Sequence, residues 1–291
     1  MTIMTEGKNH YILTASCAGA LGQVAAVSGF LAERGCYIME MSQFDDILSG
    51  RFFVRAVFRT DPGKTPPLGQ LRQEFVIPAE RFAMEWAIHD TLVRPRVLIL
   101  VSKFDHCLND LLYRYRTGDL KMDIPVVLSN HPDLERLVQW HDIPFIHLPV
   151  TPQTKAAQEA HLLEIIEETR ADLVVLARYM QVLSPPICER LQGHVINIHH
   201  SFLPGFKGAR PYHQAFERGV KLIGATAHYV TTDLDEGPII EQVVERVDHT
   251  YRPEHLVAAG RDMECLALAR AIKFHIEHRV FLNGNKTIVF R

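Results

Sequence analysis

Three polar residues in two segments of the chain have the side chains needed to act on a carbonyl group. Asn197 and His199 stand two positions apart in the run VINIHH (195–200), whose other leading residues are Val and Ile. Side chains two apart on a strand point to the same face, so Asn197 and His199 share a face while Ile198 points into packing on the other. An amide donor beside an imidazole can hold a carbonyl oxygen that becomes negative during a reaction.

The third residue is Asp235, which lies in the segment HYVTTDLDEGPII (228–240). We expect a strand to end near Thr232 and the following loop to bring the carboxylate to the same sheet edge as His199. A carboxylate there can orient an imidazole or take a proton from water. Since the pattern indicates no Ser or Cys nucleophile, it favours direct attack on a carbonyl over a covalent intermediate.

Neighbouring residues allow other interpretations. His200 is expected to point away from Asn197 and to be structural, and Asp233 is expected to form a turn. Histidine and carboxylate ligands suit zinc, so a metal site at His199, His200 and Asp235 is an alternative. Adjacent histidines on a strand diverge, however, and make poor partners for one ion. We therefore expect neither a metal nor another cofactor.

The segments around these residues alternate between short apolar runs and helices. Strands are predicted at 97–102, 125–129, 144–150, 172–177 and 195–199, and helices at 108–116, 132–141, 154–170 and 184–192. Such alternation is typical of a parallel sheet covered on both faces. Ligands of these open, Rossmann-like sheets bind outside the carboxyl ends of the strands. The α/β domain continues with strands at 224–232 and 238–247, whose direction the pattern leaves open, and a helix at 254–278.

The first part of the chain has a different pattern. Strands are predicted at 11–17, 36–46, 50–60 and 82–90, and helices at 20–35 and in the first half of 68–82, with a break near Pro78. The resulting β-α-β-β-α-β order is ferredoxin-like. We expect a flexible tail over 1–9, this domain over 10–90, a linker over 91–95 and the α/β domain over 96–291.

Composition is that of an ordinary globular protein and excludes several classes. The 291 residues are 47% hydrophobic with a net charge of -3, so no basic face for nucleic acid is indicated. No apolar run approaches the roughly 20 residues that span a bilayer, and the N-terminus lacks the apolar core of a signal peptide. Five scattered Cys without CxxC pairs indicate reduced thiols. We therefore expect a cytoplasmic protein with no nucleic-acid or membrane partner.

Several of these segments together resemble the folate-dependent formyltransferase family. The resemblance rests on Asn197-x-His199, Ser201-x-Leu203-Pro204, Gly208, Asp235-x-Gly237-Pro238-Ile239-Ile240 and LARYMQVLSP (176–185). The hydrolytic branch of the family is similar in NIHHSFLP, in GARPYHQA, in the ending RVFLNGNKTIVF and in an N-terminal domain that resembles an ACT domain. The resemblance covers essentially the whole chain after the tail.

This resemblance implies a reaction in which 10-formyltetrahydrofolate and water give tetrahydrofolate and formate. It implies that Asn197 holds the formyl oxygen as it becomes an oxyanion, that His199 donates to this oxygen or relays a proton, and that Asp235 positions the water and accepts its proton. His228 and His200 would support these residues. Folate contacts, many of them from main-chain groups, are implied at Leu176, Arg178, Tyr179, Met180, Val182, Leu183, Ser201, Asp233 and Gly237.

The acceptor of the formyl group is the main open alternative. Transfer to glycinamide ribonucleotide would require a Gly- and Ser-rich phosphate loop after the first strand of the α/β domain. Residues 102–110 read SKFDHCLND, which contains no Gly, and Asp105 would repel a phosphate, although Lys103 could attract one. A second alternative is an amino-acid sensor that has lost catalysis. The presence of Asn197, His199 and Asp235 argues against it.

The resemblance to an ACT domain implies pairing across subunits and binding of a small amino-acid effector at the interface. Members of the hydrolytic branch often carry Cys-Pro-Asp before the first helix, whereas Cys17 is followed here by Ala18 and Gly19. The proline and carboxylate that would touch an effector are therefore absent. We expect a homo-oligomer, whether a dimer, a tetramer or a hexamer, more than we expect effector binding.

Overall fold

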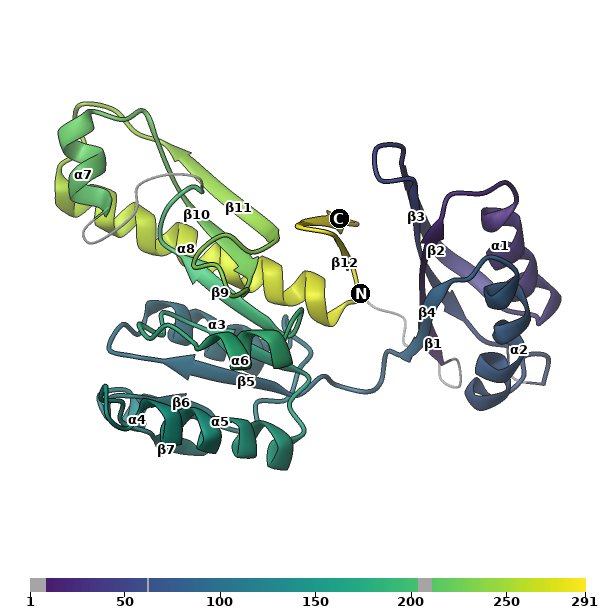
Figure 1. The fold of residues 1–291 in the computed structure, drawn as a ribbon, viewed down its shortest axis with the longest axis horizontal. Helices are drawn as coiled ribbons and strands as arrows, with labels where there is room; N and C mark the ends of the chain where they lie inside the picture. Colours follow the sequence, from purple (N-terminus) through teal and green to yellow (C-terminus); the bar gives the residue numbers. More distant parts are fainter. Residues whose placement is uncertain (1–8, 62, 204–210) are drawn as a thin grey trace. The chain divides into compact units, whose positions relative to one another are not determined.

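The computed structural model describes residues 9–61, 63–203 and 211–291. The chain divides into two compact units, residues 1–94 with 290–291, and residues 95–289 (Figure 1). Residues 1–8 of the expected tail lie outside the described residues. So do Pro204 and Gly205 of the Leu-Pro-Gly turn and Gly208 of the family motif.

The first unit is a four-stranded sheet with two helices. Its sheet order, β2-β3-β1-β4, is antiparallel throughout, which confirms the ferredoxin-like prediction. Phe30 and Phe75, one from each helix, pack edge to face with ring centroids 4.9 Å apart in the core of the unit. The elements are β1 (His10–Ala18), α1 (Gln23–Glu33), β2 (Tyr37–Asp46), β3 (Arg51–Arg59), α2 (Leu68–Arg81) and β4 (Glu85–Asp90).

Helix α2 corrects one expectation. The predicted break near Pro78 does not occur, and the helix continues to Arg81. A proline removes one backbone donor and crowds the carbonyl four residues earlier, which usually ends or kinks a helix. Here the helix ends within one turn of Pro78, and Ala79 on that turn is buried in the core. Packing therefore holds the last turn in place.

The second unit is an α/β domain with the sheet order β11-β10-β9-β8-β5-β6-β7. Strands β9, β8, β5, β6 and β7 are parallel, which confirms the mostly parallel open sheet. Strands β10 and β11 are each antiparallel to the preceding strand. The elements are β5 (Val97–Val101), α3 (His106–Thr117), β6 (Val127–Ser129), α4 (Glu135–Gln139), β7 (Phe145–His147), α5 (Lys155–Thr169), β8 (Leu173–Leu176), α6 (Pro185–Arg190), β9 (Val195–His199), α7 (Pro211–Arg218), β10 (Leu222–Tyr229), β11 (Ile239–Arg246), α8 (Pro253–Ile276), β12 (Val280–Asn283) and β13 (Lys286–Val289).

Strand β5 shows why the parallel strands are continuously apolar. Val97, Ile99 and Val101 are buried in one cluster with residues of α3 and α8. Leu98 and Leu100 are buried in a second cluster with residues of α5 and α6. Helices therefore cover both faces of the sheet, as an uninterrupted apolar strand predicts, and the functional residues must lie at the strand ends and in the loops.

No helix among the described residues combines the length and the apolar character that a membrane span requires. All five cysteines of the chain carry free thiols, and four of them are buried. The absence of disulfides fits the scattered, odd number of Cys in the sequence.

Candidate active site

Strand β9 brings Asn197 and His199 to one face of the sheet. Ile196 and Ile198 are buried in the cluster that includes α8, so the alternation of the strand leaves the amide and the imidazole on the opposite face. His199 is 7% exposed, and Asn197 is partly exposed. The two side chains therefore share a face, as their spacing predicts.

The loop that carries Asp235 does not begin at the edge that the sequence pattern indicated. Strand β10 runs antiparallel to β9, with Thr226 opposite His199 and Tyr229 opposite Ile196. Strand β10 therefore ends toward the amino end of β9, because the carboxyl ends of antiparallel neighbours lie at opposite edges. The pattern had left the direction of this strand open, and the expected position of the carboxylate beside His199 is reached through the following loop. The loop turns back and places Asp235 against His199.

Two backbone features are found where the loop after β10 turns back toward His199. Asp235 has a φ of 58°, in the left-handed region that costs most residues about 1–2 kcal/mol and that Asn and Asp tolerate best. Gly237 passes so close to β10 that a Cβ would overlap the carbonyl oxygen of Tyr229. Only glycine fits there. The Asp-x-Gly spacing therefore belongs to the geometry of the loop.

His199 and Asp235 form the central ion pair of the site. His199 Nδ1 lies 3.2 Å from Asp235 Oδ1. The hydrogen bond from His199 is the largest cause that holds the pKa of Asp235 well below its usual range, against the opposing effect of burial. Because an ionised carboxylate only accepts hydrogen bonds, His199 Nδ1 carries a proton. His199 Nε2 is buried and has no hydrogen-bond partner among the described residues.

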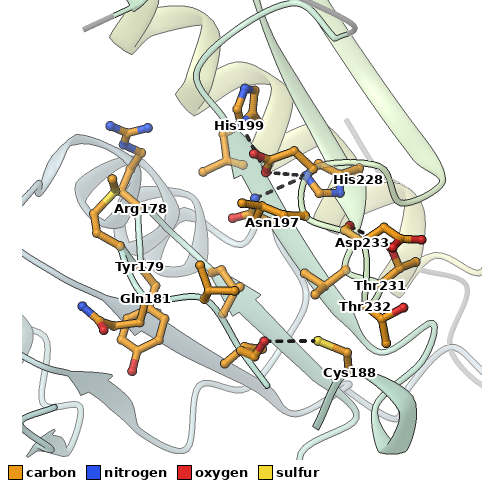
Figure 2. Close-up of a pocket in the computed structure, with 18 of the residues that line it drawn as sticks. Arg178, Tyr179, Gln181, Cys188, Asn197, His199, His228, Thr231, Thr232 and Asp233 are labelled. Atoms are coloured by element: carbon orange, nitrogen blue, oxygen red, sulfur yellow. Dashed lines mark hydrogen bonds and ion pairs between the residues drawn. The ribbon is translucent and has the colours of Figure 1, made fainter. Parts of the chain in front are cut away.

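His228 orients the amide of Asn197. The two residues face each other across β9 and β10, and Asn197 Nδ2 lies 3.3 Å from His228 Nε2 (Figure 2). His228 Nδ1 lies 2.9 Å from the carbonyl oxygen of Tyr229, to which it donates. In the neutral ring Nε2 is then an acceptor, so it takes one amide hydrogen of Asn197 and leaves the second for a ligand.

His200 does not diverge from His199, contrary to the expectation from the sequence. Strand β9 ends at His199, and the two rings stack with centroids 4.9 Å apart and planes inclined by 25°. Strand alternation therefore no longer separates them. Arg178 Nη1 donates to His200 Nδ1 at 2.8 Å. Burial, with the positive charge of Arg178, lowers the pKa of His200 to about 4.

Divergence is consequently no argument against a metal at His199, His200 and Asp235. In the structure, Nδ1 of His199 faces Asp235 and Nδ1 of His200 accepts a hydrogen bond from Arg178. Neither Nδ1 atom is therefore available to a metal ion in this arrangement.

Ligand atoms with metal-binding spacing occur elsewhere in the described part of the chain, at His106, Cys107 and Glu264, within 4.8 Å of one another. Arg178 Nε lies 3.3 Å from Glu264 Oε2. A cation beside the carboxylate opposes metal binding there.

A cavity of about 280 Å³ adjoins these residues, near the lower end of the range for small-molecule sites. Of the predicted site residues it is lined by Leu176, Arg178, Tyr179, Met180, Val182, Leu183, Asn197, His199, His200, His228, Asp233 and Asp235. Ser201 and Gly237 do not line it. Ser201 is buried, and its carbonyl oxygen accepts from the Thr226 hydroxyl.

The cavity also has lining residues that the sequence pattern did not single out. These are Gln181, Cys188, Ile198, Val230, Thr231, Thr232 and Leu234. Thr231 and Thr232 directly precede the predicted loop, and this position is the one sequence feature that could have marked them as lining residues. Cys188 lies on α6, and its apolar surroundings give no sign of a ligand site.

Residues 95–272 match the family model described as Formyl transferase. The parallel sheet, with Asn197, His199 and Asp235 at one cavity, belongs to this class of formyl-group enzymes. A curated protein from Corynebacterium sp. (strain P-1), named formyltetrahydrofolate deformylase, is 54% identical over 99% of this chain and 100% of its own length. The chain belongs to the formyltetrahydrofolate deformylase family.

Solved structures agree with this assignment. The crystal structure of formyltetrahydrofolate deformylase from Burkholderia mallei ATCC 23344 is 61% identical, with a TM-score of 0.93, and covers 97% of this chain and 100% of its own. Glycinamide ribonucleotide transformylase 1 from Symbiobacterium toebii is 31% identical, with a TM-score of 0.63, and covers 68% of this chain and 95% of its own. The similarity to the deformylase is therefore closer and extends over both units.

Proposed function

We propose that this chain hydrolyses 10-formyltetrahydrofolate to tetrahydrofolate and formate, which supplies formate and balances the one-carbon folate pools used in purine biosynthesis. The observation that carries this proposal is His199 Nε2, a buried nitrogen on a residue that lines the cavity, with no hydrogen-bond partner in the described part of the chain. Its ring is held by a carboxylate and stands on the same strand face as an amide with one free hydrogen. Such a pair suits a carbonyl oxygen. The names of the relatives support the same reaction.

Asn197 and His199 would stabilise the tetrahedral intermediate. The formyl oxygen accepts the free amide hydrogen of Asn197 and a hydrogen from His199 Nε2 while it becomes negative. In this arrangement His199 enters the reaction with a proton on each ring nitrogen: Nδ1 donates to Asp235 at 3.2 Å, and the negative charge that develops on the formyl oxygen balances the charge of the ring. His228 contributes by holding the amide of Asn197 in the donating orientation.

Asp235 would hold the attacking water. As the water oxygen bonds to the formyl carbon, one water proton passes to Asp235. The carbon–N10 bond then breaks, N10 receives the proton from Asp235, and formic acid leaves and ionises in solution. Because its pKa is depressed, the carboxylate keeps this proton only transiently, which suits a relay.

We propose that the pterin ring lies between segments 176–183 and 233–237, largely against main-chain groups. The backbone N–H of Met180 is already donated to Ser102 Oγ at 3.0 Å, so this amide is not a folate donor. The side chains of Met180 and Val182 are exposed and line the cavity. They would contribute apolar contact with the ring.

The start of helix α3 supports water over glycinamide ribonucleotide as the acceptor. The loop before His106 contains Phe104 and Asp105 in place of the small residues of a phosphate loop. Asp105 Oδ2 accepts from Asn109 at 3.1 Å, which keeps a negative charge at the helix N-terminus. A phosphate would be repelled where a helix otherwise attracts it.

The test is to follow formate from 10-formyltetrahydrofolate with and without glycinamide ribonucleotide. Formate that appears at the same rate without the ribonucleotide supports hydrolysis. Consumption of the folate only in the presence of the ribonucleotide would overturn the proposal in favour of transfer. No turnover in either mixture would favour a sensor without catalytic activity.

For the first unit, we propose a role in assembling a cytoplasmic homo-oligomer. The ferredoxin-like fold, the free thiols and the exposed Tyr37, Ile47 and Leu48 on and beside β2 support this proposal. Binding of a small amino-acid effector is the weaker part of it. Sedimentation would measure the subunit number, and a monomer would contradict assembly. Titration calorimetry with glycine and methionine would test effector binding, and no heat would leave assembly alone.

A further inference from the structure

A second group of charged and polar side chains is centred on Glu264 of α8, which is 2% exposed. Glu264 Oε1 accepts from the Tyr212 hydroxyl at 3.0 Å, and Oε2 faces His106 Nε2 at 2.7 Å. Arg178 Nε lies 3.3 Å from Oε2, an ion pair without hydrogen-bond geometry. We call Glu264, Arg178, Tyr212 and His106 the Glu264 cluster.

The Glu264 cluster is charged. Burial alone would raise the pKa of Glu264, but the hydrogen bond from His106 and the charge of Arg178 outweigh it, so the pKa lies below its ordinary value. The carboxylate is therefore ionised at neutral pH. Arg178 is always protonated in proteins. The ion pair is thus present throughout the pH range in which the enzyme can be assayed.

Helix α8 has a glycine that makes room for this cluster. A Cβ at Gly260 would overlap the ring and hydroxyl oxygen of Tyr212. Glycine inside a helix is about 1 kcal/mol less favourable than Ala, so its presence here needs a reason. The close approach of Tyr212 provides one, because it brings the hydroxyl onto Glu264, one turn further along the same helix.

Arg178 connects the Glu264 cluster to the catalytic residues. Its Nη1 donates to His200 Nδ1 at 2.8 Å. A guanidinium has donors only, so His200 Nδ1 has no proton and the ring is neutral, with its proton on Nε2. The lowered pKa of His200, about 4, agrees with this geometry. This neutral ring is the one that stacks on His199.

We propose that Arg178, held by Glu264, is a positioning residue that keeps His200 neutral and stacked on His199, so that His199 presents Nε2 to the formyl group. The proposal rests on the hydrolysis proposed above. A protonated His200 would place a like charge 4.9 Å from the His199 ring and repel it when it is charged during the reaction. The side chain of Arg178 is thus a support for His199 and not a folate ligand.

Four charged or titratable groups face His200. They are Arg178 after β8, His199 on β9, Asp235 in the loop after β10 and Glu264 on α8. The first two disfavour a proton on His200, and the two carboxylates favour one. Burial, the largest cause of the lowered pKa, remains when Arg178 is removed, so we expect the pKa of His200 to rise from about 4 while staying below its ordinary value.

The first test compares kcat for formate release between pH 5.5 and pH 8 in wild type, R178M and R178M/E264Q. The double variant leaves no buried charge without a partner, so its folding is better preserved. A rise of the His200 pKa to about 5.5 would leave roughly half of the rings protonated at pH 5.5. We therefore expect kcat of both variants to fall more than that of wild type between pH 8 and pH 5.5, by about twofold in R178M and by less in R178M/E264Q, which also loses a carboxylate that favours the proton.

Two further variants make this result specific. R178M/H200F should recover the wild-type pH profile, because phenylalanine can stack on His199 but cannot bind a proton. R136M makes the same change at an exposed arginine of α4 and should keep the wild-type profile. An R178M/E264Q profile parallel to that of wild type would show a merely structural Arg178 and overturn the proposal.

The second test needs no activity. Nitrogen NMR of histidine-labelled wild type, with the His200 signals identified by their loss in H200F, should show Nδ1 unprotonated down to pH 5. A His200 that titrates near pH 6.5 in wild type would overturn the proposal whatever the reaction. Failure of the proposed hydrolysis would be seen separately, as wild type that releases no formate at any pH.

Discussion

The proposed catalytic residues and the Glu264 cluster are both polar groups of the second unit with little exposure to solvent, and they differ in the atoms that they leave without hydrogen-bond partners. Around Asn197 and His199, one amide hydrogen and one ring nitrogen remain for a ligand. In the Glu264 cluster, both oxygens of the carboxylate have partners, and the carboxylate does not line the cavity. Arg178 and His200 join the two groups.

This difference separates residues that can bind a substrate from residues that hold other side chains in place. An unpartnered buried polar atom costs roughly 1–3 kcal/mol, so a fold keeps one where a ligand will use it. In the Glu264 cluster the corresponding atom is Arg178 Nε, which has no hydrogen bond among the described residues but lies in an ion pair 3.3 Å from Glu264 Oε2, so the members of the cluster hold one another in one arrangement. Charge and burial alone do not distinguish the two groups, because each contains a histidine and a carboxylate with little exposure to solvent.

Loss of the Asp235 carboxylate should have the largest effect. We expect Asp235→Asn to lower kcat at least about 100-fold, because the amide cannot take a proton from water, and His199→Ala to do the same. Formate release measures both. Asp262→Asn makes the same change at an exposed position of α8 and should leave kcat unchanged. Near-normal formate release by either active-site variant would remove the distinction between the two groups.

The Glu264 cluster should respond in stability. Glu264→Leu leaves the charge of Arg178 buried without its partner, which lowers the free energy of unfolding by about 3–5 kcal/mol. Urea unfolding of the full chain measures this. The double variant Glu264→Leu/Arg178→Met removes both charges and should recover most of the loss. If the single variant unfolds like wild type, the ion pair is not the support that its burial indicates.

A smaller loss is expected at the glycine beneath Tyr212. Gly260→Ala forces the helix and the tyrosine ring apart, and we expect about 1–3 kcal/mol of destabilisation from this overpacking. A Cβ added at Gly29, in α1, would have no neighbouring atom within 4 Å among the described residues outside the helix's own backbone. Gly29→Ala should therefore stabilise by about 0.5–1 kcal/mol. Thermal unfolding compares the two, and equal signs would contradict the special role of Gly260.

The smallest effect concerns acid stability. The folded state lowers the pKa of Asp235 from its ordinary 3.8, so the ionised carboxylate stabilises the fold above that pH and loses this contribution as the pH falls below it. The difference in unfolding free energy between wild type and Asp235→Asn should therefore shrink from pH 5 to pH 3. Urea titrations at each pH measure it. A constant difference would mean that the ion pair with His199 contributes nothing to stability.

Much of the fold follows from local pattern. Continuous apolar runs such as Val97–Val101 predict a strand buried on both faces, and β5 has its side chains in two cores. The direction of β10 did not follow, because a strand buried on both faces has the same apolar pattern beside a parallel neighbour as beside an antiparallel one. The sequence therefore left open the side of the sheet from which Asp235 arrives, although it predicted the proximity of Asp235 to His199.

The residues that hold the site in place were not predicted from the sequence. Glu264 lies 65 positions after His199 (264 − 199), in a helix with no motif. Its one signal is a charge at helical spacing from Gly260, Ala267 and Leu268, which are buried residues of the same helix. The stacking of His199 on His200 also escaped prediction, because strand alternation stops where the strand ends.

The left-handed backbone of Asp235 limits how this enzyme can vary. A position with a φ of 58° is open to Gly, Asn and Asp at the least strain, and of these only Asp bears a charge. Glutamate, the chemically nearest replacement, is the wrong residue for the backbone, and asparagine, the sterically nearest, is the wrong residue for the reaction. If Asp235 has the role proposed above, a replacement at this position can therefore keep either the backbone conformation or the carboxylate, but not both.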